Sequence, residues 1–132
     1  MIDRTDDYSS ITNVLQAYFD GLYHADSNQL EKVFHIDARY VNTVTGEYIN
    51  FSRCEYFAVV DQRQAPASTN EIRNEEILAI EFGGANMAFA RVKMLMMKRE
   101  YSDFLTLIFT EERWQIICKV FDYQHQTNSH VL

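Results

Sequence analysis

The chain is short of the residues that mark several structural and functional classes. Its 132 residues include two cysteines, one proline and four glycines. Cys54 and Cys118 form no CxxC pair and have no metal-ligand spacing, so we expect both to be reduced core thiols of a cytoplasmic protein. The glycines form no phosphate-binding loop, and His24 and His35 lack a third ligand in the pattern. Neither a cofactor nor a metal is therefore expected.

Positive charge is also scarce. Twelve Lys and Arg residues stand against nineteen Asp and Glu, which gives a formal net charge of −7, and no basic run occurs. Binding to a phosphate backbone or to an anionic membrane surface depends on such a run. The first ten residues are acidic and lack the apolar core of a signal peptide, and no segment is apolar for long enough to cross a bilayer. Neither nucleic acid nor a membrane is expected as a partner.

Apolar and aromatic side chains, in contrast, are abundant. Hydrophobic residues make up 47% of the chain and aromatic residues 14%. A chain of this length can bury a core without disulfides or metals, and we expect residues 1–132 to form a single domain. With eight Tyr and nine Phe, we expect some of the rings to line something other than solid core.

The first half of the chain carries helical patterns. Apolar residues between 11 and 22 recur at intervals of three and four, which predicts a helix with one buried face. Asp26 is a candidate N-cap for a second, short helix. Ser52 and Glu55 form the capping-box pattern at the start of a third helix. Two short strands are expected within residues 38–51, between the second helix and the third.

The second half alternates with period two, which predicts strands. Gly83-Gly84 marks one hairpin, and Arg99-Glu100 and Glu111-Glu112 are the expected turns of two more. Side chains alternate between the two faces of a sheet, so these turns determine which residues share a face. One face, expected to lie under the helices, is almost wholly apolar: Ala88, Ala90, Val92, Met94, Met96, Asp103, Leu105, Leu107, Phe109, Trp114, Ile116, Cys118, Val120 and Asp122.

Two carboxylates, Asp103 and Asp122, stand on this inner face. Diagonal neighbours on paired strands are ~7–8 Å apart, so we expect the two acids to be close. An acid in apolar surroundings is driven toward its neutral form, which can donate a hydrogen bond to a ligand. The alternative is that both acids lie at the open rim and face water. We favour that alternative for Asp122, which is near a strand end, whereas for Asp103 the pattern favours neither.

The opposite, outer face of the sheet is too apolar to be solvated. It is expected to carry Phe104, Ile108, Ile117 and Phe121, and an apolar patch of this kind usually marks an interface. We therefore expect a symmetric homodimer through this face. The alternative is that a loop or the C-terminal tail covers it.

Two stretches of the sequence resemble a known superfamily. A long helix with Tyr18 on its buried face leads through ADSNQLEKVFHIDA into a strand, and DFLTLIFTEERWQIICKVF follows in the second half. In order and spacing these stretches resemble the nuclear transport factor 2-like superfamily, which includes ketosteroid isomerase and the SnoaL-like cyclases, and most closely its lumazine-binding-like group. The resemblance implies an α+β fold, in which a cone-shaped, strongly curved, mostly antiparallel sheet packs against three N-terminal helices with a pocket between them.

Three functions fit this resemblance, and the fold alone does not choose among them. The first is a small-molecule-binding domain with an apolar, aromatic-lined pocket for a flat or polycyclic ligand. The second is a cofactor-free isomerase, dehydratase or cyclase with Tyr18 and Asp103 as catalytic residues, after the ketosteroid isomerase pattern of a Tyr and a neutral Asp. The third is a non-catalytic, dimeric interaction module.

The resemblance and the inner-face register together give a set of candidate site residues. In the ketosteroid isomerase pattern the position of the base falls on Asn42, and an Asn side chain cannot abstract a proton. This departure from the pattern argues against isomerisation of the steroid type, and it leaves open both polarisation of a ligand carbonyl and binding of an enolate-like ligand. Besides Tyr18 and Asp103, the residues expected to bind the ligand are Phe34, Tyr40, Asn42, Tyr56, Met94, Met96, Leu105, Trp114 and Asp122.

Overall fold

A computed structural model describes residues 4–126 of the chain as an α+β structure. Six strands form one sheet in the order β2-β1-β6-β5-β4-β3, in which β1 and β6 are parallel and all other neighbours are antiparallel. The elements are α1 (Thr5–Tyr23), α2 (Ser27–Glu31), β1 (Phe34–Asn42), β2 (Ile49–Ser52), α3 (Arg53–Gln62), the 3-10 helix η1 (Pro66–Thr69), β3 (Glu75–Phe82), β4 (Met87–Met96), β5 (Arg99–Thr110) and β6 (Arg113–His125).

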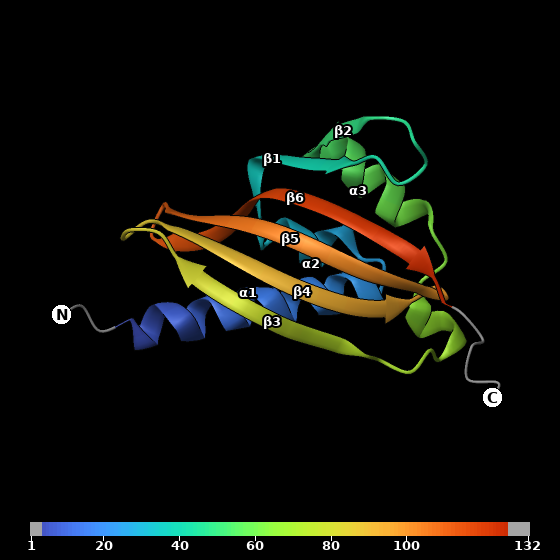
Figure 1. The fold of residues 1–132 in the computed structure, drawn as a ribbon, viewed down its shortest axis with the longest axis horizontal. Coiled ribbons are helices and arrows are strands. Elements are labelled where there is room, and N and C mark those ends of the chain that lie inside the picture. Colours follow the sequence, from blue (N-terminus) through green and yellow to red (C-terminus); the bar gives the residue numbers. More distant parts are fainter. Residues whose placement is uncertain (1–3, 127–132) are drawn as a thin grey trace.

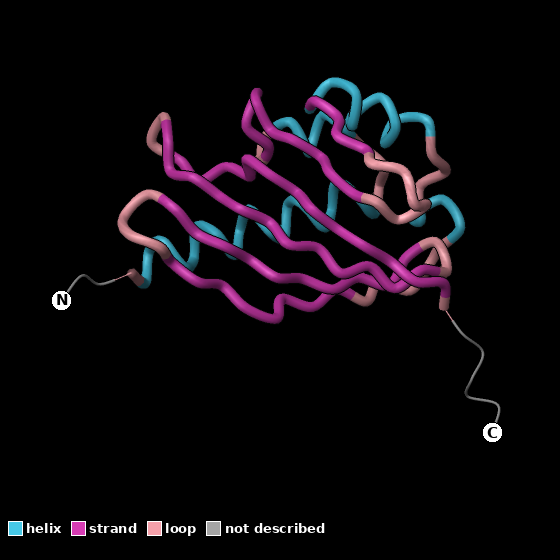
Figure 2. Tube along the Cα trace, turned by 45° about the horizontal axis from the view of Figure 1, so that its top comes forward, coloured by secondary structure: helices cyan, strands magenta, loops and turns pink. Residues whose placement is uncertain are grey.

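The helices lie against one face of a curved sheet (Figures 1 and 2). The apolar stripe expected on the first helix is confirmed, because the side chains of α1 that recur at three and four residues are buried against the strands. Its buried residues include Ile11, Leu15, Tyr18, Phe19 and Leu22. The architecture expected from the sequence, three N-terminal helices on a mostly antiparallel sheet, is therefore confirmed.

Local capping signals fix where the shorter helices begin. The Ser52 hydroxyl accepts a hydrogen bond from the Glu55 amide at 3.2 Å, and the Glu55 carboxylate accepts one from the Ser52 amide at 2.9 Å. This is the capping box expected for α3. The Asp26 side chain accepts a hydrogen bond from the amide of Asn28 at 2.9 Å and caps α2, also as expected. Both signals are local, which is why the sequence alone reveals them.

Two tight turns set the register of the long strands. The turn between β5 and β6 is Glu111-Glu112, as expected, and both residues have positive φ, as a two-residue primed turn requires. The turn between β4 and β5 is Met97-Lys98, so the expectation of Arg99-Glu100 is wrong. The error leaves the facing of side chains unchanged, because moving a turn by two residues keeps the same parity. Accordingly, the even-numbered residues from 88 to 96 are all buried, as expected.

The pairing of β5 with β6 contains a bulge that the sequence pattern does not reveal. Leu107 pairs with Ile116, whereas the next residue along, Thr106, pairs with Cys118. Ile117 is therefore an extra residue on β6 with no partner on β5. An extra residue of this kind reverses the facing of every side chain beyond it.

Beyond this bulge, the facing expected for β6 is wrong. Phe121, expected on the outer face, is buried on the inner face opposite Asp103, and Lys119 is buried on the same inner face. Val120 and Asp122, placed on the inner face by the expected register, are exposed on the outer one. Asp122 thus faces water, as favoured, but the pocket role given to it is wrong, since the two acids lie on opposite faces.

The two cysteines are not the core thiols that were expected. Cys54 is exposed on α3, and Cys118 is half-buried and turned outward by the bulge. Partial burial raises the pKa of the Cys118 thiol.

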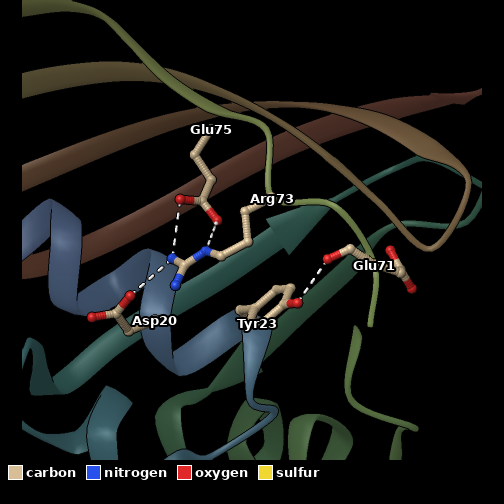
Figure 3. A network of polar contacts seen from close by, with 5 residues as sticks. All are labelled: Asp20, Tyr23, Glu71, Arg73 and Glu75. Carbon is tan, nitrogen blue, oxygen red and sulfur yellow. Dashed lines mark hydrogen bonds and ion pairs between the residues drawn. The ribbon is translucent and has the colours of Figure 1, made fainter. Parts of the chain in front are cut away.

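Arg73 fastens the segment that leads into β3 to the end of α1 (Figure 3). Its guanidinium lies 2.8 Å from a carboxylate oxygen of Asp20 on α1 and 2.8 Å from one of Glu75 on β3. It also lies 4.7 Å from the centre of the Tyr23 ring, whose hydroxyl donates a hydrogen bond to the backbone carbonyl of Glu71 at 2.7 Å. These contacts hold the edge strand β3 against the helix layer.

The capping box generates a test of local stability. Ser52→Ala removes the oxygen that accepts from the Glu55 amide and should lower the free energy of unfolding by about 1 kcal/mol. Ser9→Ala is the control, because Ser9 is exposed inside α1 and alanine is the better helix former. It should leave the stability equal or slightly higher. Urea unfolding followed by circular dichroism measures both variants, and an equal effect of the two would contradict the capping role.

Candidate functional site

A polar cluster is buried on the inner face of the sheet, among apolar side chains. It consists of Tyr18 from α1, Tyr56 from α3, Asp103 from β5 and Lys119 from β6, with exposed fractions of 0%, 1%, 0% and 4%. The Tyr18 hydroxyl donates a hydrogen bond to the Oδ2 atom of Asp103. The Lys119 Nζ atom lies 3.8 Å from the same oxygen and donates a hydrogen bond to the Tyr56 hydroxyl at 3.1 Å. Four elements thus meet at one buried acid–amine pair.

Aromatic rings enclose the Lys119 amine. Its Nζ atom lies 5.1 Å from the ring centre of Tyr18, 5.6 Å from that of Tyr40, 5.0 Å from that of Tyr56 and 5.0 Å from that of Phe121. Ring faces attract a cation, and they also exclude water from it. The amine is therefore held by ring faces and by one phenol, with a single carboxyl group nearby.

Burial moves both members of the pair toward their neutral forms. It raises the pKa of the Asp103 carboxyl, and the opposing effects of Lys119 and of the Tyr18 hydrogen bond are smaller. It lowers the pKa of the Lys119 amine, and the attraction of Asp103 opposes this less strongly. Burial beside Asp103 also raises the pKa of Tyr18 well above its ordinary value, so its hydroxyl stays a donor. The Oδ1 atom of Asp103 has no hydrogen-bond partner among the described residues, which adds to the cost of ionising this acid.

A cleft of about 230 Å³ opens beside this cluster. It lies at the end of the sheet where the arrowheads of β4 and β6 point in Figure 1. Lys119 belongs to both the buried cluster and the cleft wall. The lining consists of Tyr40, Asn42, Val44, Thr45, Val59, Arg63, Met96, Arg99, Tyr101, Lys119, Phe121 and Tyr123.

The lining carries two arginines, Arg63 and Arg99, and the Lys119 amine, and none of the described residues that line it is an Asp or Glu. Arg99 lies 4.4 Å from the ring centre of Tyr123 and donates a hydrogen bond to the Tyr101 hydroxyl at 3.3 Å. Within residues 4–126 neither arginine forms an ion pair with a carboxylate. On a chain of net charge −7, this local excess of positive charge makes the cleft suited to an anion.

The expected ligand-binding residues fall into three groups. Tyr40, Asn42 and Met96 line the cleft. Phe34, Tyr56 and Leu105 are fully buried behind it. The remaining three lie elsewhere: Met94 borders a separate small hollow beside Tyr23, Trp114 donates to Asp7 at the start of α1, and Asp122 is on the outer face.

The two residues expected to be catalytic, Tyr18 and Asp103, lie together but do not line the cleft. The Tyr18 hydroxyl donates to Oδ2 of Asp103, and Lys119, which is part of the cleft wall, lies beside the same oxygen. Sequence reasoning missed Lys119 because it assumed an unbroken alternation along β6. One signal was present: Lys119, Phe121 and Tyr123 alternate in a phase opposite to that of Trp114 and Ile116, which indicates a bulge between them.

The part of the chain that the structure describes contains neither a membrane-spanning helix nor a cluster of metal-ligating side chains. Across residues 4–126 no helix is long and apolar enough to cross a membrane. In the same range no group of three or more His, Cys, Asp or Glu side chains could hold a metal ion.

Comparison with known proteins gives a family and a fold. The model of the family described as "Putative lumazine-binding" matches residues 6–122, whereas no curated protein matches the sequence. Among solved structures, the chain is similar to an NTF2-like protein of unknown function from Silicibacter pomeroyi DSS-3, with 23% identity and a TM-score of 0.83 over 93% of this chain and 100% of that one.

Two other solved structures agree. An NTF2-like protein of unknown function from Shewanella baltica OS155 has 22% identity and a TM-score of 0.83 over 94% of this chain and 98% of that one. A ketosteroid isomerase-like protein from Erwinia carotovora atroseptica SCRI1043 has 15% identity and a TM-score of 0.71 over 90% and 97%. At such identities the likeness shows the fold alone, and that fold is the one the sequence resemblance implied.

The raised pKa of Asp103 predicts a specific pH dependence of stability. Its contribution is complete below the pKa of an unfolded Asp, about 3.9, and is lost as the pH rises through the higher folded value. From about pH 4 toward neutral, the wild type should therefore lose stability relative to Asp103→Asn, by at most ~1.4 kcal/mol per pH unit. The Asn side chain still accepts from Tyr18, so the variant keeps that hydrogen bond.

Urea unfolding of both proteins at a series of pH values measures this difference. Asp122→Asn, on the exposed outer face, is the matched control for removing one acid from the chain. A difference between wild type and Asp103→Asn that stays constant from pH 4 to pH 7 would show that Asp103 titrates alike in the folded and unfolded states.

Proposed function

We propose that this chain, which belongs to the family described as "Putative lumazine-binding", binds a small, flat, anionic molecule in the cleft between β1, α3 and the ends of β4 and β6. The observation that carries the proposal is the charge of the lining: two arginines, an amine and no carboxylate among the described lining residues, on an acidic protein. A cleft lined by one sign of charge concentrates ligands of the opposite sign. Arginine in particular pairs with carboxylate or phosphate through two parallel hydrogen bonds.

The aromatic wall of the cleft supports a flat ligand. The Tyr40 ring is stacked on Tyr56 at 4.3 Å between ring centres and on Phe51 at 5.8 Å, and Phe121 lies 5.0 Å from it. Stacked rings of this kind form a surface on which a further planar ring can pack. The family description names a lumazine, and a heterocycle of that shape suits such a wall.

The size of the cleft narrows the ligand further. About 230 Å³ is below the ~300–1,000 Å³ typical of sites for drug-sized ligands. We therefore propose one ring or two fused rings, the smaller end of the flat or polycyclic class expected from the sequence. The catalytic role expected for Tyr18 and Asp103 stays a prediction. In the ligand-binding function proposed here neither residue touches the ligand, and Asp103, which accepts a hydrogen bond from Tyr18, influences the protonation of Lys119.

The ligand proposal is tested with a matched pair of fluorescent probes, pterin-6-carboxylate and its neutral parent pterin. The acid should bind more tightly, because Arg63 and Arg99 face it in the cleft. A hydrogen bond to a charged group contributes ~1.5–3 kcal/mol, so Arg63→Gln should weaken binding of the acid by about tenfold or more and leave that of pterin unchanged.

Arg91→Gln is the control for this measurement, because Arg91 is exposed on the outer face of β4. It should change the affinity for neither probe. Equal affinity of the wild type for pterin-6-carboxylate and pterin would overturn the proposal that the cleft selects anions.

We also propose that the outer face of the sheet forms a symmetric homodimer. With the bulge taken into account, its apolar centre contains Phe104 and Val120, which are 48% and 44% exposed, and Phe89, whose ring lies 5.5 Å from that of Phe104. Ile108 remains on this face, whereas Phe121 does not. An exposed apolar centre on the outer face of a sheet suits a self-complementary contact about a twofold axis.

A single charge in the centre of this face tests the dimer. Phe104→Asp should halve the mass measured by light scattering at micromolar concentration, because a carboxylate cannot be buried there without a partner. Tyr48→Asp is the control, since Tyr48 is 68% exposed in the connection before β2. A wild type that is monomeric at this concentration would show that the outer face is not a dimer interface.

A further inference from the structure

We propose that Lys119 forms an imine with its ligand, so that the cleft takes an anionic aromatic aldehyde or ketone and holds it through a reversible covalent bond. The inference rests on the anion-binding cleft proposed above and adds the reactive group of the ligand. The observation behind it is the position of the amine, which belongs to the cleft wall while Asp103, the one acid beside it in residues 4–126, is buried behind it.

Lys119 differs in setting from every other lysine of the chain. Lys32, Lys93 and Lys98 are exposed, whereas Lys119 is 4% exposed and enclosed by rings. Burying an amine in this way is costly, and an aliphatic side chain at the same place would fill the space without that cost. A buried lysine that also borders a cleft therefore calls for a chemical explanation.

The surroundings of Lys119 favour the nucleophilic form of its amine. A neutral amine attacks a carbonyl carbon and a protonated one does not, and burial lowers the pKa of Lys119. Asp103 raises that pKa in turn, but less strongly. The titratable and charged groups that face the amine come from five parts of the chain: Tyr18 of α1, Tyr40 of β1, Tyr56 of α3, Arg63 after α3, and Tyr101 and Asp103 of β5.

The reaction requires no oxidant, reductant or cofactor. The Nζ lone pair adds to the carbonyl carbon, the C–N bond forms, and the π electrons of the C=O bond move to oxygen. Nitrogen loses one proton and oxygen gains one, which gives a carbinolamine. The hydroxyl group then takes up a proton from the Asp103 carboxyl group and leaves as water while the nitrogen lone pair forms the C=N bond. The iminium that results gives its N–H proton back to the Asp103 carboxylate, which leaves the neutral imine. Addition of water reverses these steps and releases the carbonyl compound.

Asp103 is the proton carrier for this chemistry, and Tyr56 is the positioning residue. Asp103 lies 3.8 Å from Nζ, and its raised pKa keeps the carboxyl group protonated, so that it gives a proton to oxygen and takes up the one that nitrogen loses. The Tyr56 hydroxyl accepts a hydrogen bond from Nζ at 3.1 Å and orients the amine. Arg63 and Arg99 would pair with the acidic group of the ligand, while the stacked rings hold its plane.

The test uses 4-carboxybenzaldehyde with sodium borohydride, which reduces an imine to a stable secondary amine. Peptide mapping by mass spectrometry should place the adduct at Lys119, formed at pH 7 faster than at Lys93, since a lowered amine pKa leaves a larger neutral fraction of the amine. Lys119→Met should lose this fast adduct, whereas Lys93→Met should keep it. Because the peptide map of the wild type shows which lysine carries the adduct, the proposal is tested even if Lys119→Met does not fold.

A pH profile separates a reactive lysine from one that is merely structural. Labelling of Lys119 should level off at a lower pH than labelling of Lys93, which is exposed. In Asp103→Asn the Lys119 profile should move to still lower pH, because the carboxylate that opposes the fall of the amine pKa is gone. Identical profiles for the two lysines would overturn the imine proposal.

Two further compounds distinguish failure of this inference from failure of the proposed function. The alcohol 4-(hydroxymethyl)benzoate cannot form an imine; if it binds in a manner that depends on Arg63 while Lys119 is labelled no faster than Lys93, the imine proposal is overturned and the anion-binding function stands. Neutral benzaldehyde lacks the acid. If it labels Lys119 as fast as 4-carboxybenzaldehyde does, the imine proposal is supported and the anion-binding function fails.

Discussion

The arrangement of the helices on the sheet depends on one buried pair, Asp103 and Lys119. Two groups that would be charged in water lie 3.8 Å apart behind a wall of rings, and their desolvation must be offset locally. The partners come from different helices: the Tyr18 hydroxyl of α1 donates to the acid, and the Tyr56 hydroxyl of α3 accepts from the amine. A polar network is favourable only when its members are satisfied, so these two hydroxyls position α1 and α3 over the sheet more specifically than apolar packing alone would.

One extra residue in β6 decides which side chain of that strand lies beside Asp103. Were Ile117 paired like its neighbours, Asp122 would face the core beside Asp103, and Lys119 would be solvated on the outer face. The bulge exchanges the acid for an amine, and a like-charged pair of carboxylates becomes an acid–base pair whose members both tend toward neutrality. Bulges often re-aim side chains next to binding sites, and here the consequence extends to the sign of the charge in the adjoining cleft.

The sequence predicts well what short-range rules determine. The buried stripe of α1, the capping box at Ser52 and the turn at Glu111-Glu112 follow from spacing and residue type within a few positions. The turn between β4 and β5 is predicted two residues too late, yet the residues of these two strands assigned to the inner face are still correct. A shift of the turn by two residues leaves each side chain on the same face of the sheet. The bulge at Ile117 is different, since it depends on which strand register buries the most apolar surface. The two arginines of the cleft come from distant parts of the chain, one directly after α3 and one at the start of β5, and share no local pattern.

The net charge of a protein excludes fewer classes of ligand than a first reading of its composition suggests. A net charge of −7 without a basic run argues against long polyanions, whose binding requires many cations along an extended surface. It does not argue against a small anion, which needs two or three cations converging on one point. Arg63 and Arg99 provide two, and no acid among the described lining residues neutralises them. Within a Debye length of ~8 Å at physiological ionic strength, the local cations therefore outweigh the distant acids, and the charge that selects a ligand is that of the cleft rather than that of the chain.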